Sequence, residues 1–334
     1  MLELRRPAAV LRHDRPAVVP LLPLRGAQVE HRLDREGHAG FDDRVVPGCG
    51  VEVRDDQTRV ERLPDPVARV VAHDPVAEPG RELLDDASDD VDLAAGADGN
   101  GASFVEDFDR LDLKRWYVSD GWANGDHQNC TWSKRQVGIS NGTLRLAFEQ
   151  RRAGDRDYAC GEIQTRGEFK YGAYEVRMKP VAGSGLNSSL FTYIGPTHGK
   201  PHDEIDFEFL GKDPSQVQLN QYVDGVGNNE KLVDVAGGAD SAFNDYAFIW
   251  EPERIRWFIN GELVHTADDP AKLPQNAQKI YLALWGSDTL TGWMGAFQDE
   301  GRKVMEVDRV SFTAQGDACQ YPQSIVCRIE ERSE

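Results

Sequence analysis

Short segments in which apolar and polar residues alternate recur along the chain from Phe104 onward. A period of two is typical of strands with one buried face. Asn141-Gly142 and Asn260-Gly261 stand beside such segments, and Asn-Gly pairs favour tight hairpin turns. The alternating segments are Gly142–Phe148, Tyr174–Met178, Ser189–Ile194, Ile205–Phe209, Val217–Tyr222, Tyr246–Trp250, Ile255–Ile259, Glu262–His265, Ile280–Trp285 and Val304–Phe312. They predict an all-β domain of about 210 residues, either an antiparallel sandwich or a barrel.

Helical and membrane signals are weak. No segment of ten or more residues has a convincing helical period, and Asp269–Gln275 is predicted to form one short turn at most. No apolar run approaches the ~18 residues that span a membrane, so we expect no membrane span.

The first hundred residues differ in composition from the rest. Residues 1–100 contain no Lys, Ile, Trp or Tyr, and Phe41 is their only aromatic residue. With so few large apolar groups to offset chain entropy, this segment is expected to be mostly disordered or poorly packed. One hypothesis is a mis-assigned start or a wrong-frame translation; the alternative is a genuine Pro-rich acidic linker. N-terminal sequencing of the native protein would separate the two.

The beginning of the chain pairs basic residues with an apolar patch. Pro16, Pro20 and Pro23 interrupt that patch, and no small-residue cleavage site closes it convincingly. It is therefore not predicted to be a signal peptide.

The charge of the chain bears on its partners. It has 57 Asp or Glu against 38 Lys or Arg, a formal charge of -19. Proteins that follow the phosphates of nucleic acid need clustered Lys and Arg, so a nucleic-acid partner is not expected. A neutral or anionic polysaccharide fits the balance better.

The strongest chemical signal is the acidic strand at residues 203–211, DEIDFEFLG. Side chains two apart on a strand share a face, so Glu204, Asp206 and Glu208 point one way. Ile205, Phe207 and Phe209 would point into the core. Three carboxylates on one face repel each other, and burial would raise some of their pKa values. A solvated acidic strand and a set of calcium ligands are the alternatives.

The same spacing suits glycoside hydrolysis. Alpha carbons four residues apart on a strand lie ~13 Å apart. Two Glu side chains that lean together can bring their carboxyl groups to about 5–5.5 Å, the separation in retaining enzymes. One Glu would attack the anomeric carbon while the other protonates the leaving oxygen, and the Asp between them could hydrogen-bond the nucleophile.

DEIDFEFLG resembles the signature of glycoside hydrolase family 16. The segments SDGWANG, NCTW, FTYIGPTHG, LGKD and VQLNQY resemble its bacterial β-1,3-1,4-glucanases (licheninases). GPTHGKPHDEIDFE and WSKRQV are closer still to the rhizobial endo-β-1,3-1,4-glycanases that depolymerise succinoglycan. The resemblance runs from about Phe104 to Phe312. It implies a β-jelly roll of two curved antiparallel sheets with an open cleft on the concave face.

Carried over by residue, the resemblance makes Glu204 the nucleophile, Glu208 the general acid/base and Asp206 the assisting carboxylate. It implies an endo-acting, retaining β-glycanase that works by double displacement and requires no cofactor for catalysis. Aromatic faces pack on sugar C–H groups, and amides and carboxylates bind hydroxyl groups. The expected substrate-binding residues are Trp122, Asn124, Glu162, Tyr193, His202, Asn220, Tyr222, Trp285 and Trp293, whereas Trp116, Trp250 and Trp257 are interpreted as core residues.

Three positions depart from the licheninase pattern. His202 stands where licheninases usually carry Trp, Gln164 where they carry Arg, and Ala283 where they carry Asn. All three belong in or near the sugar subsites, so linkage and substituent specificity are the properties in question. His202 is interpreted either as a reader of an acidic or acylated substituent or as an ordinary hydrogen-bonding residue.

The resemblance also implies a Cys130–Cys160 disulfide and, less directly, a structural calcium ion with Asp308 as its side-chain ligand. Cys319 and Cys327 could close a second loop, and Cys49 is the odd cysteine. Two disulfides favour an oxidising compartment, so a secreted or periplasmic protein is expected, and a monomer. No cysteine or histidine cluster suggests zinc.

These expectations divide the chain into a low-complexity segment at 1–100, a catalytic domain at 101–315 and a tail at 316–334. Two other readings of the β-rich region remain open. One is a carbohydrate-binding sandwich without catalysis, because lectins share the architecture. The other is a transglycosylase that uses the same covalent intermediate with a sugar acceptor.

Overall fold

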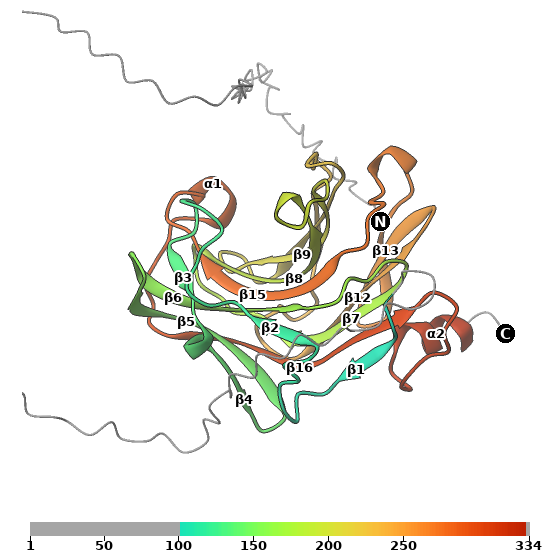
Figure 1. Cartoon of the computed structure of the whole chain (residues 1–334), viewed down its shortest axis with the longest axis horizontal. Helices are drawn as coiled ribbons and strands as arrows, with labels where there is room; N and C mark the ends of the chain where they lie inside the picture. Colours follow the sequence, from blue (N-terminus) through green and yellow to red (C-terminus); the bar gives the residue numbers. More distant parts are fainter. Residues whose placement is uncertain (1–100, 332–334) are drawn as a thin grey trace, which may run out of the picture. The chain divides into compact units, whose positions relative to one another are not determined.

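The computed structural model describes residues 101–331, and side chains up to Ile329 (Figure 1). The expectations for residues 1–100, Cys49 among them, and for the last three residues lie outside this described part. No helix within it is long and apolar enough to cross a membrane.

The described residues form two facing layers of antiparallel strands. The first layer, here the cleft sheet, has the order β11-β10-β9-β8-β15-β6, with β2 beside β6. The second, here the outer sheet, continues from β6 through β5-β16-β7-β12-β13-β14, with β1, β3 and β4 paired at its margins. β3 and β6 run parallel, and the other strand pairs run antiparallel.

The bounds of the elements follow the chain. The strands are β1 (Phe104–Glu106), β2 (Trp116–Val118), β3 (Cys130–Trp132), β4 (Val137–Ser140), β5 (Thr143–Ala153), β6 (Arg156–Thr165), β7 (Gly172–Lys179), β8 (Leu186–Ile194), β9 (Asp203–Leu210), β10 (Gln216–Tyr222), β11 (Lys231–Asp234), β12 (Asn244–Glu251), β13 (Arg254–Ile259), β14 (Glu262–Ala267), β15 (Lys279–Gly286) and β16 (Lys303–Ala314). The helices are α1 (Thr291–Met294) and α2 (Ile325–Glu331), with short 3₁₀ turns at Lys134–Gln136, Pro196–His198 and Pro270–Lys272.

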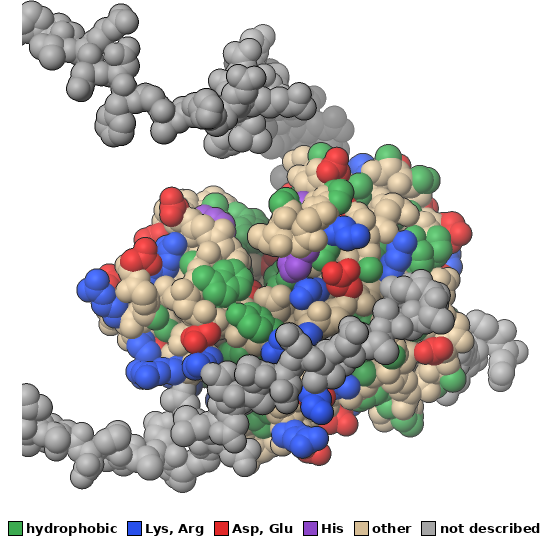
Figure 2. Space-filling view, in the orientation of Figure 1, with side chains coloured by type: hydrophobic (Ala, Val, Ile, Leu, Met, Phe, Trp, Pro, Cys, Tyr) green, Lys and Arg blue, Asp and Glu red, His purple; other side chains and the backbone are tan. Residues whose placement is uncertain are grey.

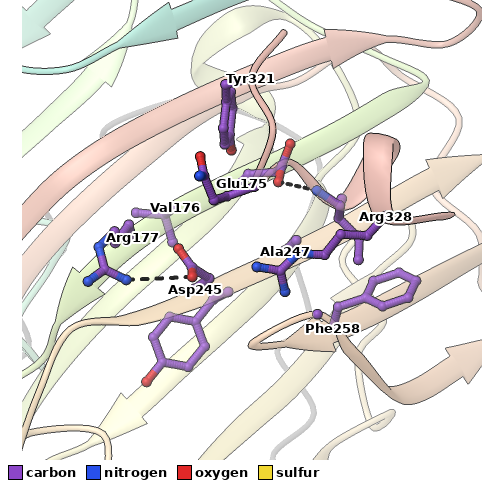
Figure 3. A pocket seen from close by; sticks show the side chains of 12 residues that line it. Glu175, Val176, Arg177, Asp245, Ala247, Phe258, Tyr321 and Arg328 are labelled. Atoms are coloured by element: carbon purple, nitrogen blue, oxygen red, sulfur yellow. Dashed lines mark hydrogen bonds and ion pairs between the residues drawn. The ribbon is translucent and has the colours of Figure 1, made fainter. Parts of the chain in front are cut away.

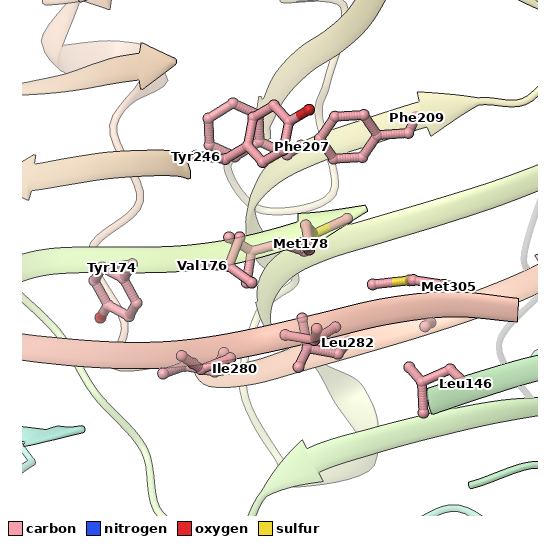
Figure 4. Packing of buried hydrophobic residues seen from close by; sticks show 14 of the residues in the cluster. Leu146, Tyr174, Val176, Met178, Phe207, Phe209, Tyr246, Ile280, Leu282 and Met305 are labelled. Atoms are coloured by element: carbon pink, nitrogen blue, oxygen red, sulfur yellow. The ribbon is translucent and has the colours of Figure 1, made fainter. Parts of the chain in front are cut away.

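The core lies between the two sheets and is built from the apolar half of each alternating strand. Ile205 and Phe207 of β9 are fully buried and Phe209 is 2% exposed. Their rings meet the outer sheet at Tyr246 of β12, with centroid distances of 5.7 Å from Phe207 and 4.6 Å from Phe209. Figure 4 shows these rings above Met178 and Met305. The predicted inward set on β9 is therefore confirmed, and its carboxylates must face the other way.

The two Asn-Gly turns form where the sequence predicts them. Asn141 and Gly142 have φ values of 54° and 69°, and Asn260 and Gly261 have 51° and 83°. Positive φ at both central residues matches the right-handed twist of the flanking strands. These turns set the registers β4–β5 and β13–β14.

β6 is the long strand for which the alternating pattern gave no signal. Its first half pairs with β5 in the outer sheet, and Gly161–Gln164 pair with β15 in the cleft sheet. The last seven residues of β6 are all buried. Three of these buried residues, Glu162, Gln164 and Thr165, are polar, so polarity does not follow burial along β6 and its sequence, RDYACGEIQT, shows no clear strand period.

The Cys130–Cys160 disulfide links β3 to β6, as the resemblance implied. Both cysteines are fully buried, and the Gln128 side-chain amide contacts both sulfur atoms at 3.7 and 3.5 Å. The bond ties the loop between β2 and β3 to the centre of the sheets.

The tail after β16 folds back onto the outer sheet. The buried Glu175 of β7 accepts hydrogen bonds from Ser324 Oγ at 2.7 Å and from Ile325 N at 2.8 Å, at the beginning of α2. Ile325 packs on Ala173, Ala247 and Phe258, and a Cys319–Cys327 disulfide closes the tail. Figure 3 shows Glu175, Tyr321 and Arg328 around the small cavity beneath this helix.

Candidate active site

The three carboxylates of β9 stand at the middle of the cleft sheet, on the face opposite the core. In the strand register Glu204 lies between Tyr193 of β8 and Tyr222 of β10, and Asp206 lies between Phe191 and Asn220. Glu208 lies between Ser189 and Gln218. Cross-strand neighbours share a face, so each carboxylate belongs to a row of side chains that runs across the strands.

These carboxylates and the face around them form a groove of about 600 Å³. That size is ordinary for a ligand site. Figure 2 shows a hollow in the surface of the molecule, with histidine side chains in purple beside it. The lining residues are Glu204, Asp206, Glu208, Gln218, Asn220, Tyr222, Glu230, Leu290, Gly292 and Trp293.

Burial alters the proton affinity of two of the carboxylates. The pKa of Glu208 is raised to about 8, mainly by burial. The negative charge of Glu204 raises this pKa further, whereas a hydrogen bond from Asn187 lowers it. Burial, followed by the charges of Glu204 and Glu208, raises the pKa of Asp206 well above its usual range. Asp206 and Glu208 are therefore protonated at neutral pH.

Glu204 has a different environment, because a histidine contacts it. His202 Nε2 lies 2.6 Å from Glu204 Oε2. A protonated Asp206 donates a second hydrogen bond to Glu204, one of the contacts that raises the Asp206 pKa. One neutral acid and one carboxylate with two donors thus stand four residues apart on one strand.

Several buried polar atoms of β8 and β9 have no hydrogen-bond partner among the described residues. Ser189 Oγ, Asn187 Oδ1 and Asp206 Oδ1 are buried and make no hydrogen bond to the described residues.

The predicted binding residues fall into two groups. Asn220, Tyr222 and Trp293 line the groove, and Trp293 donates a hydrogen bond from Nε1 to Gln218 Oε1 at 2.7 Å. Trp285 lies beside Trp293, with ring centroids 6.1 Å apart. Tyr193 and His202 lie beside Glu204. Tyr193 is its cross-strand neighbour on β8, and the rings of Tyr193 and His202 contact each other.

Trp122, Asn124 and Glu162 form the second group, outside the lining of the groove. Trp122 is 39% exposed and packs edge-on against Trp132, whose Nε1 donates to Asn124 Oδ1 at 3.4 Å. Glu162 is buried and accepts a hydrogen bond from Ser119 Oγ at 2.6 Å. Burial raises the pKa of Glu162 to about 8.

The register relates this second group to the carboxylates. Glu162 pairs with Ala283, Ala283 with Ser189, and Ser189 with Glu208. At about 4.8 Å per strand, Glu162 lies roughly 14 Å from Glu208 along one row of the sheet. The two groups are thus parts of one surface, separated by β15 and β8.

The licheninase departures lie on this surface as well. Gln164 pairs with Tyr281 of β15, one row from Glu162, and Ala283 is the small residue between Glu162 and Ser189. Trp116, Trp250 and Trp257 are fully buried, in agreement with their interpretation as core residues.

Sequence reasoning missed Gln218, Glu230, Leu290, Gly292 and Asn187. Gln218 shares the face of Asn220 and Tyr222 on β10, so the period of two could have found it. Glu230, Leu290 and Gly292 are contributed by loops and the short helix α1, which reach the groove only through the fold.

Asp308 does not present an open ligand to a cation. It lies at an irregularity of β16, and its carboxylate forms an ion pair with Arg177 Nε at 3.2 Å. Residues 101–331 contain no group of three or more His, Cys, Asp or Glu side chains suited to a metal. The side chains around Asp308 therefore do not fit a calcium site unless Arg177 moves away.

Family comparison agrees with this geometry. Residues 124–303, which include the groove and its walls, match the model of glycosyl hydrolases family 16. The chain belongs to this family. It is a glycoside hydrolase, and the two curved sheets are the family's jelly roll.

Relatives within the family are similar over most of their length. An endo-1,3-1,4-beta-glycanase, ExoK, from Rhizobium meliloti is 60% identical over 228 residues, which are 68% of this chain and 85% of the relative. A beta-glucanase from Bacillus subtilis is 40% identical over 64% of this chain and 87% of the relative. The solved beta-glucanase of Bacillus licheniformis superposes with a TM-score of 0.62 at 39% identity, over 64% of this chain and 99% of that structure.

Proposed function

We propose that the protein is an endo-acting, retaining β-glycanase that hydrolyses internal β-1,3 or β-1,4 linkages. The observation that carries the proposal is the pair on β9: Glu208, whose raised pKa of about 8 keeps it protonated, and Glu204, which is held by His202 and Asp206. A groove open to solvent lets a long chain lie across the sheet, which suits cleavage within a polymer.

The proposed mechanism assigns one role to each carboxylate. Glu204 attacks the anomeric carbon, and Glu208 gives its proton to the leaving glycosidic oxygen. Glu208, now ionised, then takes a proton from water as that water releases the sugar from Glu204. Asp206 donates a hydrogen bond to Glu204 and so orients it. Two displacements at the same carbon retain the β configuration.

The aromatic and amide residues of the groove would bind the sugars. Trp285 and Trp293 offer adjacent ring faces, and Asn220 and Gln218 offer amides in the rows of Asp206 and Glu208. Trp122, Asn124 and Glu162 would bind sugars farther along the sheet. The similarity to an endo-1,3-1,4-beta-glycanase and to beta-glucanases supports a β-1,3-1,4-linked glycan as the substrate. We propose that this glycan is a β-glucan or a bacterial exopolysaccharide such as succinoglycan.

The proposal also covers where and how the protein works. The two disulfides in the described residues favour an oxidising location, so we place the enzyme outside the cytoplasm, as a monomer. Catalysis needs no metal in this mechanism. A structural calcium at Asp308 stays a prediction. To bind the ion, the Asp308 carboxylate would have to give up its ion pair with Arg177.

Reducing-end release from lichenan, laminarin and succinoglycan tests the proposed function. Glu204→Gln is expected to lower kcat/KM by ~10⁴-fold or more, because the nucleophile is lost. The exposed Glu253→Gln, in the turn between β12 and β13, is the matched control and should behave as wild type. NMR of the first product should show the β anomer.

Two outcomes would contradict the assignment. Glu204→Gln with wild-type activity would remove Glu204 from the mechanism. Wild-type protein that binds these polysaccharides without cleaving any of them would favour the carbohydrate-binding alternative.

A further inference from the structure

We propose that His202 is a positioning residue for the nucleophile: its imidazole donates a hydrogen bond that fixes the rotation of the Glu204 carboxylate. This inference rests on the proposed role of Glu204. It departs from the expectation that His202 binds a substituent of the substrate.

The contact is built into the strand. His202 immediately precedes β9 and, two residues before Glu204, shares its face. His202 Nε2 lies 2.6 Å from Glu204 Oε2. An ionised carboxylate only accepts hydrogen bonds, so Nε2 carries the proton whether the ring is neutral or cationic.

Two tyrosines hold the imidazole in place. The ring stacks on Tyr222, with centroids 5.1 Å apart and planes at 14°, and meets Tyr193 edge-on, also at 5.1 Å. Tyr193 and Tyr222 are the cross-strand partners of Glu204 on its two sides. The same three strands therefore fix both the donor and the acceptor.

The charges around the site give the contact its purpose. The residues that line the groove include no Lys or Arg but four acidic residues, Glu204, Asp206, Glu208 and Glu230. An imidazolium next to Glu204 would therefore be the one cationic side chain beside this acidic lining and would balance the charge of the nucleophile, and a charge-assisted hydrogen bond is stronger than a neutral one.

Asp203 and two tyrosines are the other titratable groups near His202. Asp203 accepts hydrogen bonds from Asp224 N, Gln275 N and Asn276, away from the ring, and its charge is a lesser cause of the raised His202 pKa. Tyr193 and Tyr222 both have a raised pKa and stay neutral at physiological pH. The hydrogen bond with Glu204 is the largest cause that raises the pKa of His202.

A kinetic experiment separates positioning from substrate binding. His202→Phe keeps a flat ring against Tyr222 but removes the donor, whereas His202→Gln keeps a donor. The substrate is a 2,4-dinitrophenyl β-glycoside of an oligosaccharide that the wild type cleaves, because its leaving group needs no acid. His198→Phe is the control, since His198 lies near Tyr193 and the structure shows no contact from it to the three carboxylates of β9.

We expect His202→Phe to lower kcat by ~10²-fold with little change in KM, because misplacement of a reacting group has a cost of this order. His202→Gln should recover to within about tenfold of wild type. His198→Phe should keep the wild-type kcat and KM.

NMR titration supplies a readout that does not depend on activity or on a folded His202 variant. In wild type the His202 imidazole should titrate above the ordinary value of about 6.5, and in Glu204→Gln it should titrate lower. An unchanged titration would overturn the proposal. So would His202→Phe with wild-type kcat, or with a KM defect confined to acylated polysaccharide. Activity retained by Glu204→Gln would instead overturn the proposed function.

Discussion

At the residue scale, two glutamates four residues apart on one strand have different surroundings, which fit the opposite tasks that we propose for them. Burial raises the pKa of Glu208 and outweighs the hydrogen bond from the Asn187 amide, which acts in the opposite direction. Glu204 has a histidine at 2.6 Å. The sequence alone placed both side chains on one face, since a period of two requires it. It could not assign the two environments, because Asn187 comes from β8 and the ring of His202 is held by strands on either side of β9.

The pH dependence of the reaction follows from the Glu208 environment. In the proposed mechanism the reactive form of Glu208 is the protonated one, and burial raises its pKa to about 8. We therefore expect kcat/KM for an unactivated polysaccharide to be constant at pH values below the Glu208 pKa. Above that pKa it should fall about tenfold per pH unit.

The leaving group provides the check on this limb. With a 2,4-dinitrophenyl glycoside no proton is needed, so the alkaline fall should disappear. Glu208→Gln should lose ~10²- to 10⁴-fold on the polysaccharide and far less on the activated glycoside. An alkaline limb that is the same for both substrates would rule out Glu208 as its source.

At the element scale, the predictable strands are those with one face toward the core. Tyr174–Met178, Val217–Tyr222 and Ile280–Trp285 all lie within observed strands, because their alternation records one buried side. The sequence did not predict β6, which is covered on both faces. It did not predict β2 and β3 either, because three residues are too few to show a period. The short helix α2 escaped for a related reason, since seven residues hold only two turns.

The Cys130–Cys160 disulfide is expected to support the loop that carries Trp122 and Asn124. The cysteines are 30 residues apart, and closing such a loop constrains the unfolded chain by about 3–4 kcal/mol. Replacing both cysteines with Ala should lower the free energy of unfolding by that amount and raise KM, as measured by urea unfolding and by steady-state kinetics.

The Cys319–Cys327 pair is the matched control for this prediction. It closes a loop of separation 8 on the outer sheet, so its loss should lower the free energy of unfolding by about 2–3 kcal/mol and leave KM unchanged. Equal effects of the two pairs on KM would contradict a specific role for the first bond.

At the scale of the described domain, the two faces of the sandwich have different tasks. One face carries the groove. The tail covers the other face, where Glu175 of β7 accepts hydrogen bonds from Ser324 Oγ and Ile325 N of the tail. The alternation of β7 predicted a polar outer face but not a covering helix, since Ala173 and Ala247 give no sign of what packs on them.

Ile325→Ala tests whether the tail stabilises the fold without taking part in the reaction. Ile325 is 3% exposed, and the loss of a buried Ile typically costs about 2–5 kcal/mol. We expect that decrease in urea unfolding with unchanged kcat/KM at 25 °C. The half-buried Val326→Ala should cost less, and a change in kcat/KM for Ile325→Ala would show that the two faces are coupled.

The rows of side chains across the cleft sheet have a regular spacing, which is set by the distance between neighbouring strands. From Glu162 through Ala283 and Ser189 to Glu208 and Gln218, each step is one strand, about 4.8 Å. A polysaccharide laid along such a row would meet a new strand at nearly every sugar. The pairing of strands, fixed when the chain folds, would then decide how long the released fragments are.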